Sequence, residues 1–249
     1  MILHIPHSSR LIPEHLREQI VLSDVELETE LTRMTDAYTD ELFNLPGAVV
    51  VRFPVSRLIV DVERFENDAD EPMSKVGMGK IPMKTSHGER LRRELGADEV
   101  NNLITEYYRP HHQALHAAVE KELAKRGKAL IVDCHSFPSH PLPCDREQSL
   151  TRLDICMGTD SFHTPEALTI FAVGEIVKTG FCLELNFPYS GTIVPMKFYG
   201  KDQHVSSIMI EVNRGLYMDE MTGEKNNGFG RTLEQIKEVL KEIGKFEKL

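Results

Sequence analysis

Residues 129–137, ALIVDCHSF, decide the fold: they form an apolar run that ends in an acid, a thiol and an imidazole. Runs of the same kind are MILHI at 1–5, AVVVRFPV at 48–55, LIVDVE at 58–63, FCLELNF at 181–187 and HVSSIMIEV at 204–212. Short apolar runs are typical of buried strands. Because helical patterns separate several of them, they predict an α/β fold around a mostly parallel sheet.

Three segments have helical patterns. The first runs from Ser23 to Phe43, with Ser23 or Asp24 as its N-cap. The second runs from Asp98 to Lys125, where Pro110 is expected to kink or divide the helix. The third is RTLEQIKEVLKEIGKF at 231–246. Residues 66–88 mix acidic residues, glycine, proline and methionine without a period, which predicts a long loop or lid.

Composition limits the classes of function. We expect one domain over residues 1–249, because no proline-, glycine- or serine-rich linker divides the chain. A formal net charge of −10 argues against nucleic-acid binding. No apolar stretch approaches the roughly 20 residues of a membrane helix, and the N-terminus does not read as a signal peptide. The four cysteines lack CxxC spacing and are expected to be reduced thiols, which favours a cytoplasmic protein.

Two histidines follow apolar runs. His7 comes after MILHI, and His135 comes after ALIVDC. Open α/β sheets hold their ligands at the carboxyl ends of strands. Either histidine alone is more often an ordinary loop residue, but the repeated arrangement points to a metal. Imidazoles are the commonest zinc ligands, and a catalytic zinc uses three protein groups and leaves a position for water.

The third ligand is expected in the predicted helix at 23–43. Its candidates are Asp36, Asp40 and Glu41. Asp36 and Asp40 are four residues apart and would share a helical face. Acidic residues on such a helix often form only its solvated face, and the spacing alone does not choose between them.

Hydrolysis also needs a proton carrier and a substrate anchor. Glu211 lies in a run that reads as a buried strand, where a carboxylate is expected only if it is paired or functional. An ion pair with a nearby arginine would explain it equally well. Arg57 and Arg64 flank LIVDVE, and a guanidinium binds a carboxylate with two parallel hydrogen bonds, although surface salt bridges are the commoner role of arginine.

Seven segments together resemble the N-formylglutamate amidohydrolase family, which is similar to the zinc carboxypeptidases and aspartoacylases. They are HIPHSS (4–9), DAYTDEL (36–42), SRLIVDVERFEND (56–68), YYRPHHQAL (107–115), DCHSF (133–137), NFPYSGT (186–192) and IEVNRGLYMDE (210–220). They follow the expected order over most of the chain. The resemblance implies an α/β fold with a mixed, mostly parallel sheet sandwiched between helices, of the zinc carboxypeptidase-like or phosphorylase/hydrolase-like type.

The resemblance also implies one Zn²⁺ per chain, held by His7, Asp36 and His135. The wider group often places an acidic ligand three residues after the first histidine, but here that residue is Arg10. Glu211 matches the general base. Glu63 stands where the relatives often have asparagine, and its charge would weaken the binding of a substrate anion.

Further roles implied by the resemblance concern the substrate. Arg64 would bind it near the reacting carbonyl and stabilise the oxyanion. The expected substrate-binding residues are Arg57, Arg64, Asn186, Tyr189 and Arg214, with Gly191 allowing close backbone approach and with His112 and Asp61 as structural supports.

The function expected is zinc-dependent hydrolysis of N-formyl-L-glutamate or a close N-acyl amino acid, and the family name implies histidine degradation. One alternative is a zinc carboxypeptidase or deacylase that acts on a peptide or another N-acyl compound. A second is a non-catalytic binder of a metal or an acidic ligand, because a fold does not establish a function.

Overall fold

The computed structural model describes residues 1–246, and their strands form a six-stranded sheet in the order β2-β1-β3-β6-β4-β5. The strands are β1 Ile2–Ile5, β2 Val49–Arg52, β3 Ala129–Phe137, β4 Ile155–Gly158, β5 Leu183–Leu185 and β6 Val205–Asn213. Strands β2, β1, β3 and β6 are mutually parallel, whereas β4 is antiparallel to β6 and parallel to β5. The predicted mixed, mostly parallel sheet is confirmed.

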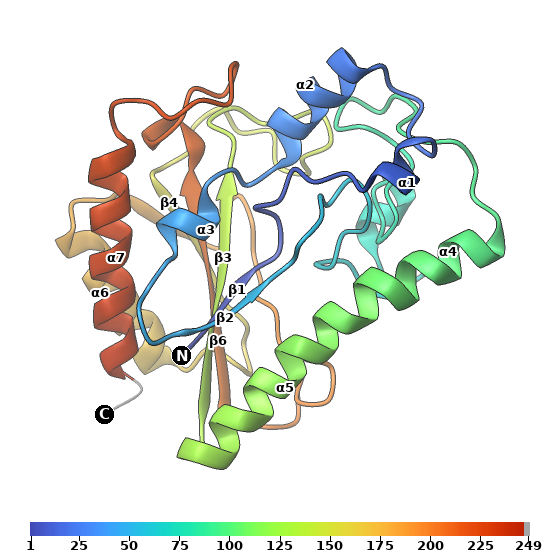
Figure 1. Cartoon of the computed structure of the whole chain (residues 1–249). Coiled ribbons are helices and arrows are strands. Elements are labelled where there is room, and N and C mark those ends of the chain that lie inside the picture. The colour runs from blue at the N-terminus through green and yellow to red at the C-terminus, as the bar shows by residue number, and fades with distance from the viewer. Residues whose placement is uncertain (247–249) are drawn as a thin grey trace.

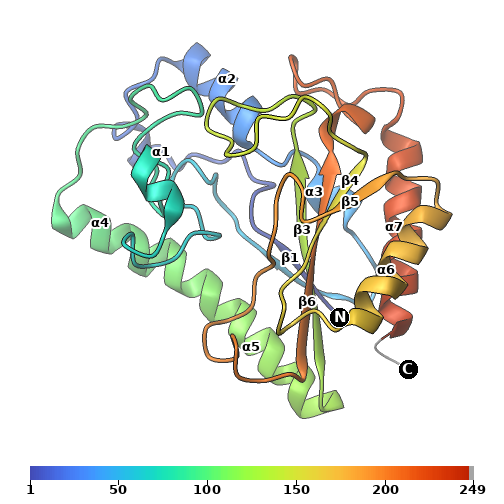
Figure 2. The ribbon, with the colours of Figure 1, turned by 180° about the vertical axis from the view of Figure 1, so that it is seen from behind.

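Helices cover both faces of the sheet (Figures 1 and 2). They are α1 Glu14–Arg17, α2 Asp24–Met34, α3 Thr39–Leu42, α4 Ala97–Leu103, α5 Arg109–Arg126, α6 Glu166–Lys178 and α7 Phe229–Phe246. Helices α3, α6 and α7 pack on one face, and α5 packs on the other. None of the helices in residues 1–246 has the length and apolar character needed to cross a membrane.

The two faces of the central strands differ because side chains alternate along a strand. Leu3, Val132, Cys134 and Ile210 point into the main apolar core beneath α6 and α7. The opposite face is apolar at its start, where Ile2, Ala129, Ile131 and Val205 meet α5. Beyond that point it carries mainly polar side chains, and these form the candidate site.

The predicted helix at 23–43 is wrong in its length. Helix α2 begins as expected after Ser23, whose side chain accepts a hydrogen bond from the backbone N–H of Glu26 in a capping box. It ends at Met34, and a break follows in which Tyr38 has a φ of 65° before α3 begins. Asp36 lies in this break and not on a helical face, and its N–H donates to the carbonyl of His7 at 3.0 Å.

The second helical segment continues past Pro110, but a π-turn just before this residue divides it into α4 and α5. Helix α4 passes through a π-helical turn, η2 Ile104–Tyr108, into α5, and Figure 1 shows α4 and α5 following one path. Proline has no N–H and its ring clashes with the carbonyl four residues earlier. A π-turn directly before Pro110 relieves that clash, because it shifts the hydrogen-bonding pattern by one residue.

LIVDVE was wrongly predicted as a strand. Residues 58–62 form turns, and Leu58, Ile59, Val60 and Val62 are buried in a second apolar cluster with side chains from α2. The run is apolar because it is buried, and periodicity alone cannot distinguish a buried turn segment from a buried strand. The expected loop at 66–88 is confirmed: it contains only a short 3-10 helix, η1 Pro72–Val76, and single bridges. A last 3-10 turn, η3, is Arg214–Leu216, and the four cysteines are free.

The capping box of α2 gives a test of the fold. Ser23→Ala is expected to lower the free energy of unfolding by about 1 kcal/mol, because it leaves an N–H at the helix start without its partner. The measurement is the urea midpoint and slope at equilibrium. Thr29→Ala, also on an exposed position of α2, is the matched control and should be neutral or stabilising. Equal losses from both variants would contradict the capping assignment.

Candidate functional site

A row of polar side chains crosses the middle of the sheet. His4 of β1 is the register partner of Asp133 in β3, and His135 of β3 is the partner of Glu211 in β6. Register partners point to the same face, and so do residues two apart on one strand. All four side chains therefore share one face, and each is at least 93% buried.

His7, Asp36 and His135 come together at the carboxyl ends of β1 and β3. One ligand atom from each lies within 4.8 Å of the others. Asp36 Oδ2 is 3.6 Å from His7 Nδ1 and 3.1 Å from His135 Nδ1. Of the three acidic candidates, only Asp36 lies here, because Asp40 pairs with Arg52 and Glu41 pairs with Lys225.

The donor set fits a zinc ion. The Nδ1 of His7 is buried and has no hydrogen-bond partner, as expected of an atom whose partner is a cation. The Nε2 of His7 contacts Asp61 Oδ1 at 2.8 Å, and the Nε2 of His135 contacts Asp133 Oδ1 at 3.0 Å. Metal-binding histidines usually bond a carboxylate through their other nitrogen, which fixes the ring and its tautomer.

Arg214 holds the remaining oxygen of Asp36. Its Nη2 donates to Asp36 Oδ1 at 2.8 Å, and its other bonds go to the hydroxyl and carbonyl of Ser136 and to the carbonyl of Arg33. Burial alone would raise the pKa of Asp36, but the hydrogen bond with His135, the nearby imidazole of His7 and the charge of Arg214 hold that pKa well below its ordinary value. These contacts occupy Arg214 with the protein itself, so the geometry favours positioning of Asp36 over the predicted contact with substrate.

Glu211 lies beside this group. Its side chain is buried, and its Oε2 has no hydrogen-bond partner. Burial raises the pKa of Glu211 to about 7, although the charge of the neighbouring His135 opposes the shift. A carboxyl group that exchanges its proton near neutral pH is suited to general acid–base chemistry.

Arg57 and Arg64 both contact Asp61, the carboxylate that holds His7. Arg57 donates to Asp61 Oδ2 through Nη2 at 2.7 Å, and the Nε of Arg64 is 3.5 Å from the same oxygen. The other contact of Arg64, to the carbonyl of Met78, also uses Nε. The terminal nitrogens of Arg64 are therefore available to a ligand.

A cavity of about 810 Å³ opens beside the polar row. Its lining combines basic side chains (Arg64, Arg109, His112, His116, Lys197), acidic ones (Glu63, Glu66, Asp70, Asp133, Asp160) and apolar ones (Val62, Phe65, Ile193, Val194, Pro195, Met196, Met209). The three potential zinc ligands do not line it. Two residues that line the cavity, Asp133 and Glu63, contact one of these ligands: Asp133 Oδ1 and Glu63 Oε1 lie 3.0 and 4.0 Å from His135 Nε2.

The predicted substrate loop divides into two parts. Ser190 and Gly191 line the cavity. Asn186 instead exchanges hydrogen bonds with Thr159, and the hydroxyl of Tyr189 accepts one from Arg152. Neither Asn186 nor Tyr189 lines the cavity, so their substrate-binding role stays a prediction.

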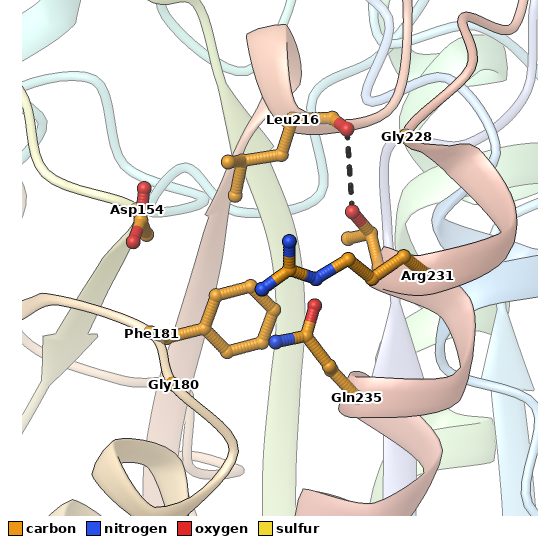
Figure 3. Close-up of a pocket in the computed structure, with 8 residues that line it drawn as sticks. Asp154, Gly180, Phe181, Leu216, Gly228, Arg231 and Gln235 are labelled. Atoms are coloured by element: carbon orange, nitrogen blue, oxygen red, sulfur yellow. Dashed lines mark hydrogen bonds between the residues drawn. The ribbon is translucent and has the colours of Figure 1, made fainter.

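A second cavity of about 270 Å³ lies at the start of α7, away from the polar row. Figure 3 shows Arg231, Gln235 and Phe181 around it, with Asp154 on the opposite side. The hydroxyl of Thr232 donates to the carbonyl of Leu216 next to it. No predicted site residue lines this cavity, and we do not assign it to the active site.

His4 and Asp133 are site residues that the sequence patterns did not single out, whereas Glu63 was noted only for its charge near the substrate. Asp133 Oδ1 accepts hydrogen bonds from both His4 Nδ1 and His135 Nε2. Part of the signal was available: alternation along ALIVDCHSF places Asp133 and His135 on one face, whereas adding His4 to that face needs the register of the two strands.

Comparisons with known proteins agree with this geometry. The N-formylglutamate amidohydrolase family model matches residues 1–218. N-formylglutamate deformylases from Pseudomonas putida and Pseudomonas aeruginosa are 23% and 25% identical over 229 residues, which is 88% of this chain and 82% of each relative. A crystal structure of N-formylglutamate amidohydrolase from Ralstonia eutropha JMP134 has a TM-score of 0.87 at 23% identity, covering 99% of this chain and 93% of that one.

The structural likeness extends over the whole chain, and the family match spans β1 to β6 and so includes every residue of the polar row. The chain belongs to the N-formylglutamate amidohydrolase family.

Proposed function

We propose that the protein is a zinc-dependent amidohydrolase that cleaves N-formyl-L-glutamate, or a close N-acyl amino acid, to the free amino acid and a carboxylate. The observation that carries the proposal is the buried group of His7, Asp36 and His135 with Glu211 directly beside it. We further propose that one domain over residues 1–249 holds this activity, that it acts in the cytoplasm, and that it serves histidine degradation.

His7 Nδ1, His135 Nδ1 and Asp36 Oδ2 would hold the zinc ion. When bound, zinc supplies a Lewis acid that polarises the acyl carbonyl and lets water ionise near neutral pH. Asp61, Asp133 and Arg214 orient the three ligands through hydrogen bonds to the atoms that face away from the ion. Three ligands leave a position open, which is the pattern of catalytic zinc sites.

Glu211 is proposed as the general base. It would take a proton from the attacking water and give it to the departing nitrogen, which must leave as a neutral amine. The burial that raises its pKa also makes it a stronger base than an exposed glutamate. The Cys156 side chain lies beside it on the same face of the sheet, because Cys156 is the register partner of Glu211 in β4.

Arg64 is proposed to bind the substrate. Arg64 lines the cavity that adjoins the metal group, and its terminal nitrogens can pair there with a substrate carboxylate or with the oxyanion formed during attack. Arg57 is proposed to act through Asp61, whose charge it balances. Arg214 is proposed as a positioning residue for Asp36.

Asp36 and Asp40 form a matched pair for testing the metal site. Asp36→Asn is expected to lose zinc and formate release together, because an amide is a weak, uncharged ligand. Asp40→Asn, four residues away and paired with Arg52, is expected to keep both. Elemental analysis of the purified variants and a formate assay with N-formyl-L-glutamate are the measurements. The proposal would be contradicted if the wild-type protein neither contained zinc nor gained activity with added divalent metal.

Glu211→Gln separates catalysis from metal binding. We expect zinc to be retained and kcat to fall by about 10²- to 10⁴-fold, the usual contribution of a general base. The measurement is kcat for formate release beside zinc content. Glu184→Gln, an exposed carboxylate on β5, is the control and should have normal kcat. A Glu211→Gln variant with normal kcat would assign Glu211 to a structural role.

A second candidate is a deacylase for an N-acyl compound with a larger apolar group. The cavity favours it: Phe65, Met196 and Tyr199 line it yet remain 47%, 62% and 42% exposed, and a site built for a small dianion would not need such a wall.

A substrate panel at fixed zinc decides between these two candidates. If N-formyl-L-glutamate is the substrate, its kcat/KM should exceed that of N-formyl-L-methionine by orders of magnitude, because the carboxylate partners in the cavity would be left unpaired. The reverse order would establish the second candidate.

A further inference from the structure

The structure contains a second group of metal-ligand type, formed by His4, Glu63 and Asp133. His4 Nδ1 lies 2.8 Å from Asp133 Oδ1 and 3.2 Å from Glu63 Oε1. These spacings match those of the first group, in which Asp36 Oδ2 is 3.1 and 3.6 Å from its two imidazole nitrogens. The His4 and Asp133 side chains are no more than 1% exposed, and that of Glu63 is 16% exposed.

Hydrogen bonds do not satisfy this group. The Nδ1 of His4 can donate one proton, but two carboxylate oxygens compete for it. The Nε2 of His4 is already bonded to His111 Nε2 at 2.7 Å. Glu63 Oε1 is consequently buried with no hydrogen-bond partner. A buried carboxylate oxygen without a partner is costly, and a cation at the centre of the three atoms would satisfy it.

We propose that His4, Glu63 and Asp133 form a second divalent-cation site, distinct from the site at His7, Asp36 and His135. One imidazole and two carboxylates suit a borderline ion such as Mn²⁺ or Zn²⁺. With the ion on Nδ1, the Nε2 of His4 donates to His111, which fixes the ring as outer partners of metal-bound histidines do.

The second ion would lie at the floor of the large cavity, because Glu63 and Asp133 both line it. There it would neutralise the local charge next to Arg64, because two carboxylates and one divalent ion sum to zero. A negative Glu63 repels a substrate carboxylate, whereas Glu63 bound to a divalent ion no longer opposes its binding to Arg64. This use of the ion rests on the proposed function, but the presence of the ion does not.

The rival to a cation is a proton. Burial and the charge of Asp133 raise the pKa of Glu63 well above its ordinary value, which favours a proton on this carboxyl group when no ion is bound. The two alternatives differ in the number of metal ions that the protein binds.

The test counts bound ions. Metal-stripped protein is titrated with Mn²⁺, with free Mn²⁺ followed by its electron paramagnetic resonance signal, and the loaded protein is checked by elemental analysis. Wild type is expected to bind two equivalents. Glu63→Gln, which keeps the shape and removes the charge, should bind one, and Asp36→Asn should also bind one, at the other site. The equivalent that each variant retains shows that it is folded.

Glu66→Gln is the control, because Glu66 lines the same cavity, is exposed and pairs with Arg109. It should bind two equivalents. One equivalent in wild type, or two in Glu63→Gln, would overturn the second site and leave the proton in its place. Neither result touches the proposed hydrolysis, since formate release depends on the first site and is assayed separately.

Discussion

The register of β1 and β6 against β3 determines where the polar side chains of the row lie. Asp133 is at the centre of this arrangement: Oδ1 accepts from His4 of β1 and from His135 two residues on, while Oδ2 accepts from the backbone N–H of Ile193. One carboxylate thereby connects two strands to the loop that walls the cavity. A slip of one residue in any one of these strands would move that strand's members of the row towards the apolar core.

Burying so many ionisable groups is unfavourable unless each is paired. The site meets this condition almost everywhere through carboxylate–imidazole and carboxylate–guanidinium contacts, such as those of Asp61 with Arg57 and of Asp36 with Arg214. Within the two ligand groups and Glu211, three described atoms remain without partners: His7 Nδ1, Glu63 Oε1 and Glu211 Oε2. These unpaired atoms belong to the two proposed cation sites and the proposed base. An unpaired buried polar atom lowers the stability of the fold, and such atoms are expected at functional positions.

Much of this could be predicted from the sequence, because strands with apolar runs and imidazoles at their ends leave a local signal. The sheet, His7 and His135 followed from such signals. The position of Asp36 did not, because the break after Met34 depends on tertiary contacts, including the bond from Asp36 N–H to the carbonyl of His7. LIVDVE was wrongly predicted as a strand, because burial in an apolar cluster and burial in a sheet produce the same amino-acid composition. The pairing of His4 with Asp133 needed the register, which is a long-range property.

The π-turn before Pro110 lies between two helices that pack against different parts of the molecule. Helix α4 and the turn contribute Leu103 and Tyr108 to the second apolar cluster, whereas α5 packs on the sheet and directs His111 at His4. Each residue added to a helix rotates the later turns of that helix by about 100°. The extra residue in the π-turn therefore sets the angular phase of α5 relative to α4. Deleting one residue from 104–108 would leave the site side chains in the sequence and yet turn His111 away from His4. The length of this segment therefore matters to the site in a way that substitutions, which keep the length, do not test.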